Sequence, residues 1–360
     1  MNSIADIALI NDVINLPKTT LQELCTDLNL DNKGYKADLV TRIYDYIQQH
    51  RGSQSEIFES SKQKLLAGKT ALTWYKLDNS ITSDEFRELV TEKSDANPFE
   101  TVDIPILTEL TTSPSLLSGA VGLNENEVYL RFAYKSGVRQ DPYGTDITTT
   151  PKSGFSTVYF DSNSSILEIR GDTRKADEIA SIVAGLLDQR VNLEPVEIPF
   201  NQTIGQIADN LEGELIDATS KPEFILEDFD EEQTNAVGNV LLALDEFFST
   251  NDTELLEEQL NYANQAFDNQ ITVPFSALIL SGMGKVGLGG QREIRGLPLY
   301  DYLNPNLQHQ GGYIRFNFHE AGLEKSYTIR VGMTTKSIYF STPSTEDVIS
   351  HVRSNVILNI

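Results

Sequence analysis

The stretch that decides how the N-terminal part of the chain folds is Thr19–Ile47, TTLQELCTDLNLDNKGYKADLVTRIYDYI. Its first half carries apolar residues at the spacing of one helical face, at Leu21, Leu24, Cys25 and Leu28. After Gly34, where the chain must turn, a second apolar face is formed by Leu39, Val40, Ile43, Tyr44 and Ile47. The stretch therefore predicts two short helices and an extended loop, with Leu30 of the loop filling the gap between them.

The run Gly34-Tyr35-Lys36-Ala37-Asp38-Leu39-Val40-Thr41-Arg42, with Leu21, Leu24 and Cys25 upstream, resembles the SAP domain. The resemblance covers residues 13–50 and implies a helix–extended loop–helix module. It also implies binding to double-stranded DNA, through the start of the first helix and the loop before the second. The residues that it implicates are Lys18, Thr20, Lys33, Tyr35, Lys36 and Arg42. Lysines on a loop and at a helix N-terminus also suit phosphate on physical grounds. Similar helical modules bind proteins, so a protein partner is the alternative.

Length and composition narrow the class of protein. A chain of 360 residues has room for two or three domains and a sizeable core. Its one cysteine, Cys25, lies on the apolar helical face, and we expect a buried core thiol. The first residues lack the basic and long apolar segments of a secretory signal. No apolar run is long enough to span a membrane. We therefore expect a soluble, intracellular protein of the cytoplasm, nucleoid or nucleus, with no membrane partner.

The net charge of −25 is concentrated in one segment. Residues 196–270 contain eighteen acidic residues and one basic residue, Lys221, whereas residues 271–360 are slightly basic. The whole-chain acidity therefore does not exclude a nucleic acid as partner. Within the acidic segment we predict a helical hairpin from Glu231–Phe248 and Thr253–Phe267, with Leu241 and Leu260 facing inward. This hairpin, in 224–270, could bind a basic protein or mask a basic surface of the chain itself.

The remaining sequence alternates strand and helix patterns. In the first part we predict strands at Ala71–Leu77, Glu127–Tyr134, Ser156–Phe160 and Ile166–Ile169, and helices at Ser83–Thr91 and Arg174–Leu187. Thr82 and Glu85 have the spacing of a capping box. A stretch rich in Gly, Pro, Asp and Thr after Tyr134 predicts a loop.

A similar order recurs near the C-terminus. There we predict strands at Tyr313–Phe318, Tyr327–Val331 and Ser337–Phe340, and a helix at Thr345–Val356. Both runs open on Y-[LI]-R-F, which suggests an internal duplication, although two domains could also share a common strand order. Strand alternation places Tyr129 and Arg131 on one face, where they could meet a partner.

The fold class that follows is α+β, with a small N-terminal helical SAP-like domain and two similar β-β-β-α units separated by an acidic helical hairpin. The expected boundaries are 1–50 for the SAP-like domain, 51–66 for a linker, 67–195 for the first α+β unit, 196–270 for the acidic linker and hairpin, and 271–360 for the second unit.

Three motif-like strings resemble sites that carry chemistry. Gly68-Lys69-Thr70 resembles the end of a P-loop, but the position that requires a glycine upstream is Gln63, and a strand follows. Gly282–Gly287 fits a dinucleotide fingerprint, but the chain continues with glycines and not with a helix. A glycine-rich turn is the better interpretation, and with Lys285, Arg292 and Arg295 it could make a second nucleic-acid contact in place of a plain hairpin loop. The acidic run 227–232 is more typical of a helix start than of a magnesium site.

No pattern supports a catalytic site. The four histidines show no metal-ligand spacing, and no nucleophile motif is present. We therefore predict no cofactor, no metal and no catalytic residue. The leading hypothesis is a non-catalytic, DNA-associated protein whose α+β body is a binding platform. A protein-interaction or regulatory protein is the alternative, and a nuclease or other enzyme of a defence or mobile-element system with scattered catalytic residues is a third.

Overall fold

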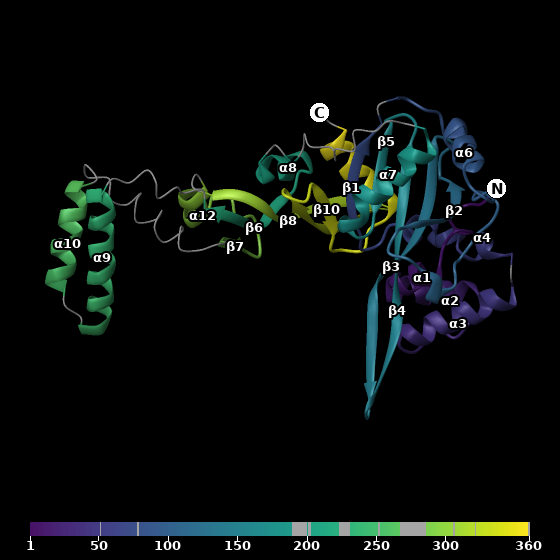
Figure 1. Ribbon diagram of the computed structural model, residues 1–360, viewed down its shortest axis with the longest axis horizontal. Helices are drawn as coiled ribbons and strands as arrows, with labels where there is room; N and C mark the ends of the chain where they lie inside the picture. Colours follow the sequence, from purple (N-terminus) through teal and green to yellow (C-terminus); the bar gives the residue numbers. More distant parts are fainter. Residues whose placement is uncertain are drawn as a thin grey trace. The chain divides into compact units, whose positions relative to one another are not determined.

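The computed structural model describes residues 1–50, 52–77, 79–188, 200, 203–222, 231–250, 253–266, 286–304, 307–320 and 322–358. Helices and a large antiparallel sheet are both present, so the α+β class is confirmed (Figure 1). The chain divides into two compact units. The larger unit contains Met1–Gly213 and Arg315–Ile360, and the smaller unit contains Glu214–Ile314.

The larger unit is built on a sheet in which β1 is a central strand, with β5 on one side and β10 on the other. Its strand order is β2 (Ser115–Val121), β3 (Glu127–Tyr143), β4 (Asp146–Asp161), β5 (Ile166–Arg170), β1 (Ala71–Lys76), β10 (Ser337–Phe340), β9 (Leu323–Gly332) and β8 (Leu307–Glu320), the last from Arg315 on. Leu72 of β1 lies opposite Arg170 on one side and Ile338 on the other. Strands from both expected α+β segments, 67–195 and 271–360, therefore share one sheet, because β1 pairs with a strand of each.

One face of this sheet is covered by α6 (Ser83–Glu92) and α7 (Ala176–Leu186). Alternate strand residues such as Leu130, Val158 and Leu167 pack there against Phe86 and Ile179, and all are buried. The helix α6 begins with the predicted capping box: the Glu85 amide donates to the Thr82 hydroxyl, and the Thr82 amide donates to the Glu85 carboxylate. The apolar residues at alternate positions of the strands thus form one side of the core.

The opposite face is covered by the N-terminal helices α1 (Ile10–Asn15), α2 (Lys18–Asp27) and α3 (Lys36–Gln49). Both predicted helices of the SAP-like stretch are present, and Cys25 is buried between them as expected. Tyr44, expected inward, is 42% exposed. Tyr129 and Tyr159 of the sheet belong to the same buried cluster as the helices. The SAP-like helices are therefore packed on the sheet.

The segment expected as a linker, 51–66, is folded from residue 52 on. It forms α4 (Gln54–Ile57), a short 3-10 turn and α5 (Lys62–Leu65). Phe58 and Leu65 are buried in the same cluster as the apolar residues of the N-terminal helices. Because these two side chains fill that cluster, the linker expectation was wrong for this segment.

The loop predicted after Tyr134 was also wrong. The strands β3 and β4 continue to pair as far as Tyr143 and Asp146, so that they form a two-stranded arm that projects beyond the rest of the sheet (Figure 1). Gly144, at φ +62°, makes the turn. Tyr143 is 88% exposed. The backbone hydrogen bonds of the pair hold the arm without a buried face, which is why no alternation marked it in the sequence.

The C-terminal run has β8, β9 and β10 followed by α13 (Glu346–Val352), which continues as a π-helical turn (Arg353–Ile357). A further short helix, α8 (Ile204–Asn210), belongs to the larger unit. The element order β-β-β-α thus occurs twice, as β3-β4-β5-α7 and as β8-β9-β10-α13. The duplication of one ancestral unit stays a prediction.

The smaller unit contains β6 (Glu214–Pro222) paired with β7 (Val286–Gly289), the short helix α12 (Pro298–Leu303), and two longer helices. These are α9 (Glu231–Thr250) and α10 (Thr253–Ala266), the predicted acidic hairpin. Its core is small and centres on Ala236, Val240 and Ala263. Leu241 and Leu260, expected inward, are 41% and 38% exposed. Among the described helices of either unit, none is long and apolar enough to cross a membrane.

Candidate nucleic-acid interface

The loop between α2 and α3 is held in shape by Arg42. Its guanidinium donates to the carbonyl oxygens of Asp31 at 2.8 Å and of Lys33 at 2.6 Å. Gly34 has φ +118°, a conformation that side-chain-bearing residues rarely adopt. A Cβ at Gly34 would lie 2.8 Å from a carboxylate oxygen of Asp38, the residue that accepts from the Tyr35 amide to cap α3. The loop therefore ends in a fixed turn.

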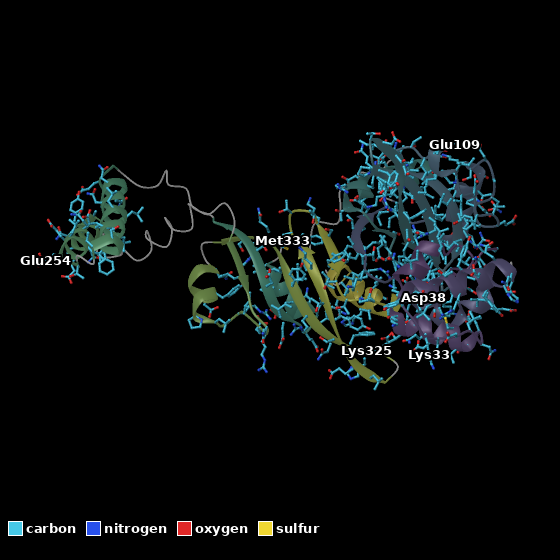
Figure 2. All side chains as sticks on the ribbon, turned by 90° about the horizontal axis from the view of Figure 1, so that it is seen from below. Lys33, Asp38, Glu109, Glu254, Lys325 and Met333 are labelled. Carbon is cyan, nitrogen blue, oxygen red and sulfur yellow. The ribbon has the colours of Figure 1, made fainter. Side chains whose placement is uncertain are left out.

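Three of the predicted contact residues lie within four positions of this turn. Lys33, Tyr35 and Lys36 are all exposed, and Tyr35 is 82% exposed. Figure 2 shows Lys33 at the outer surface of the N-terminal helices. Lys18 is also exposed, at the start of α2. These four side chains are accessible to a nucleic-acid backbone.

The other two predicted residues belong to the scaffold. Thr20 is 3% exposed, and its hydroxyl lies 3.4 Å from the ammonium group of Lys64. Arg42 uses its guanidinium on the loop and also lies 3.5 Å from a carboxylate oxygen of Asp31. The structure thus places Thr20 and Arg42 where they support the surface, while Lys18, Lys33, Tyr35 and Lys36 form it.

The second predicted contact is only partly described. Lys285 lies outside the described residues. Arg292 is exposed, whereas Arg295 donates to the carboxylate of Glu293 at 2.9 and 2.7 Å. The described end of the glycine-rich stretch, Val286–Gly289, is the strand β7 and not a turn. Backbone pairing with β6 explains the difference, because Gly287 and Gly289 lie opposite β6 residues.

The face that carries Tyr129 and Arg131 is not open to a partner. Arg131 is 3% exposed, and its Nη2 donates to both carboxylate oxygens of Asp12 in α1, each at 2.9 Å. Asp12 and Arg131 are 119 residues apart in sequence, so the strand pattern alone could not reveal that α1 covers this face.

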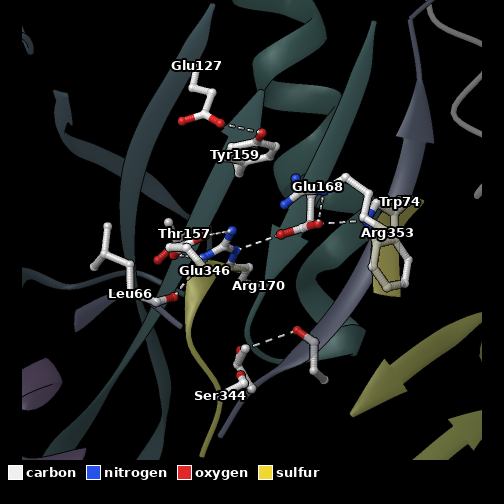
Figure 3. Close-up of polar contacts among 12 residues, drawn as sticks. Leu66, Trp74, Glu127, Thr157, Tyr159, Glu168, Arg170, Ser344, Glu346 and Arg353 are labelled. Atoms are coloured by element: carbon white, nitrogen blue, oxygen red, sulfur yellow. Dashed lines mark hydrogen bonds and ion pairs between the residues drawn. The ribbon is translucent and has the colours of Figure 1, made fainter. Parts of the chain in front are cut away.

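A buried ionic network joins β5 to α13, as Figure 3 shows. Glu168 accepts from Arg170 at 2.7 Å, from Arg353 at 2.8 Å and from the Trp74 indole at 2.8 Å. Arg170 also donates twice to Glu346, at 2.5 and 2.7 Å. Burial alone would raise the pKa of Glu168, but the charges of Arg353 and Arg170 outweigh it and lower this pKa to about 2. Since every carboxylate has its own cation, the network is structural.

The smaller unit contains a serine–histidine–asparagine chain that no sequence pattern indicates. The Ser220 hydroxyl lies 2.9 Å from Nδ1 of His309, whose Nε2 lies 2.7 Å from Oδ1 of Asn304. Burial lowers the pKa of His309, which favours the neutral imidazole. Ser220 is only 1% exposed, so no substrate can reach its hydroxyl in this conformation. The chain links β6, β8 and the end of α12 and does not form a nucleophile site.

Neither a scan against known protein families nor a search of curated proteins finds a match to this chain. Over the described residues, no group of three or more His, Cys, Asp or Glu side chains comes together as a metal site.

Proposed function

We propose that this protein is a non-catalytic, DNA-associated protein that contacts duplex DNA through the loop between α2 and α3. The observation that supports this proposal is the exposed set Lys33, Tyr35 and Lys36 on a loop whose shape Arg42 fixes. A preordered loop loses little conformational entropy when it binds a partner. Lysine ammonium groups contact phosphate, and a tyrosine ring or hydroxyl can contact sugar or phosphate.

The two carboxylates nearest to the loop lysines make contacts within the module. Asp31 and Asp38 are the acidic residues closest in sequence to Lys33 and Lys36. Asp38 caps α3, and Asp31 accepts from the Lys33 amide and lies near Arg42. Both carboxylates are therefore engaged within the module, while the two ammonium groups point to solvent without an ion pair among the described residues.

The experiment is fluorescence anisotropy of the full chain with labelled duplex and single-stranded DNA across a salt series. Lys33→Ala/Lys36→Ala should weaken duplex binding and flatten the dependence of log K on log[salt] by about 2, because about one counterion is released per phosphate contact. The matched control is Lys62→Ala/Lys76→Ala, which removes the same charge elsewhere on the larger unit and should leave the slope unchanged. Equal slopes for the two variants would refute the loop as the DNA site.

A second candidate function is supported by the acidic hairpin. It exposes several apolar side chains among its carboxylates, namely Leu241, Leu242, Leu255, Leu260 and Tyr262, and Leu242 is 72% exposed. Exposed apolar residues grouped with charge are typical of protein-binding surfaces. On this alternative the chain is a protein-interaction or regulatory protein with a basic partner. The absence of any salt-dependent DNA binding by the wild-type chain would favour it over the first proposal.

A further inference from the structure

A cavity of about 670 Å³ lies in the larger unit, apart from the exposed loop residues described above. Its walls come from the start of α2, the loop 66–70 that leads into β1, the strands β3 and β4, and the loop 342–345 that leads into α13. We name it the polar pocket. Its volume is within the roughly 300–1,000 Å³ of most small-molecule sites.

The carboxylates of the polar pocket are already neutralised. Asp12 accepts two hydrogen bonds from Arg131. Glu320 accepts from the Lys325 ammonium group at 2.5 Å and from the Tyr327 hydroxyl at 2.9 Å. Each lining carboxylate thus already has one cation at hydrogen-bond distance, and the ammonium group of Lys64 adds to the positive charge that lowers the pKa of Glu320.

Lys64 and Lys69 are further cations of the lining. Within the described residues neither has a carboxylate at ion-pair distance, and Lys64 reaches only the Thr20 hydroxyl, at 3.4 Å. Arg170 also lines the pocket, but its guanidinium already donates hydrogen bonds to the carboxylates of Glu168 and Glu346. The lining thus carries more cations than carboxylates, and this excess suits a phosphate monoester, which carries about −1.5 to −2 at pH 7. The match is notable in a chain whose net charge is −25.

The polar lining also provides hydrogen-bond donors for phosphate oxygens. Thr19, Thr70 and Thr342 line the pocket. The Thr70 hydroxyl also donates to the Ala71 carbonyl oxygen at 3.4 Å, and the Thr342 hydroxyl accepts from the Thr328 amide and keeps its own proton to donate. Two lining residues that are more than nine-tenths buried, Thr345 and Arg131, each keep one polar atom without a hydrogen-bond partner, Oγ1 and Nε respectively. These two atoms are closed to solvent, so the groups of the lining that can meet a ligand are the threonine hydroxyls and the lysine ammonium groups.

An apolar wall adjoins these groups. The partly buried ring of Phe155 lines the pocket together with Pro17 and Leu16. Aromatic rings stack with any nucleobase, because every base has a π face. Charge, hydroxyl groups and an aromatic ring thus occur together in one cavity.

We propose that the polar pocket binds a nucleoside monophosphate, either free or as the 5′-phosphorylated end of a nucleic-acid strand. The ammonium groups of Lys64 and Lys69 neutralise the phosphate, and Phe155 supports the base. This site is not a P-loop, since Gly68-Lys69-Thr70 leads into β1 and not into a helix. It also stands apart from DNA binding by the loop between α2 and α3, so each proposal can fail alone.

The test is isothermal titration calorimetry of the full chain with AMP, GMP, CMP and UMP in separate runs, beside adenosine. At least one nucleotide should bind and adenosine should not. Lys69→Ala should weaken binding about tenfold or more, as expected for the loss of a charge-assisted contact. Lys62→Ala, in the same short helix as Lys64 but outside the pocket, is the matched control and should bind within about twofold of wild type.

A second arm distinguishes the two sources of the phosphate. A 5′-phosphorylated 12-nucleotide single strand is compared with its 5′-hydroxyl form. Tighter binding of the phosphorylated strand, lost in Lys69→Ala, with no binding of free nucleotides, would assign the site to strand ends. The proposal is overturned if neither arm shows phosphate-dependent binding. It is also overturned if Lys64→Ala/Lys69→Ala, shown by circular dichroism to be folded, binds as the wild type does. Lys33→Ala/Lys36→Ala should keep nucleotide binding.

Discussion

At the scale of single residues, Glu168 shows how strongly one side chain can depend on the rest of the chain. It has no exposed surface and accepts hydrogen bonds from Trp74, Arg170 and Arg353. A buried ion pair is costly to break, because removal of one partner leaves the other charge unpaired in the interior. The guanidinium groups of Arg170 and Arg353 would both lose a counter-charge if Glu168 were neutralised.

Glu168→Gln should therefore lower the free energy of unfolding by about 3 kcal/mol at pH 7, measured by urea denaturation. The pKa of Glu168 falls from 4.5 to about 2 on folding. Its contribution is thus complete above pH 4.5 and is lost as the pH falls toward 2, so the difference between wild type and variant should narrow over that window. The exposed control Glu109→Gln should change the free energy by less than about 0.5 kcal/mol. A difference that stays constant with pH would contradict this assignment.

Single residues also show what the sequence could and could not supply for the candidate site. The resemblance around Gly34 implicated Lys33, Tyr35 and Lys36, and the structure leaves all three exposed. It did not separate them from Thr20 and Arg42, whose side chains turn toward Lys64 and the loop carbonyls. Spacing reports which residues share a helix face, whereas these contacts depend on loop geometry and on a segment 44 residues away.

At the scale of elements, amphipathic helices and half-buried strands were predictable, because one buried face leaves a period in the sequence. Phe86 and Val90 of α6 and Leu130 of β3 follow such periods and are buried. The arm of β3 and β4 shows no such period in the sequence, because its apolar residues, such as Val138, Tyr143 and Ile147, are exposed. Gly, Pro and Thr there suggested a loop, although cross-strand backbone pairing makes it a ribbon.

The arm should contribute little to stability. Removal of residues 138–151, with an Asn-Gly turn joining Gly137 to its cross-strand partner Lys152, should change the free energy of unfolding by less than about 0.5 kcal/mol. The contrast is Phe132→Ala in the buried part of β3, which should cost about 3–5 kcal/mol. Urea denaturation measures both. A large loss on shortening the arm would show that it packs on another surface.

At the scale of the whole molecule, the larger unit depends on pairing between distant parts of the chain. β1 joins β5 to β10, and Arg170 and Glu168 of β5 meet Glu346 and Arg353 near the C-terminus. The sequence predicted both β-β-β-α runs as separate units, because local patterns carry no information on which strand edges meet. Only the three-dimensional pairing shows one sheet.

A fragment of residues 1–213 should therefore lack a cooperative unfolding transition. It retains β1 to β5 but leaves an edge of β1 open and Glu168 without Arg353. The fluorescence of Trp74, the one tryptophan and 1% exposed in the whole chain, reports the transition. The control is the chain in which a Gly-Ser linker replaces residues 231–266. It should unfold cooperatively with an unchanged Trp74 signal. A two-state transition for 1–213 would show that the first part folds alone.

The position of β1 also has a consequence for synthesis on the ribosome. Ala71 pairs with Tyr339, which is translated 268 residues later. At about 5–20 residues per second, that interval is roughly 15–50 s. During this time β5 can occupy one edge of β1, while the edge that β10 will take exposes unpaired amide and carbonyl groups to other nascent chains. An unpaired strand edge of this kind is a suitable binding site for a ribosome-associated chaperone.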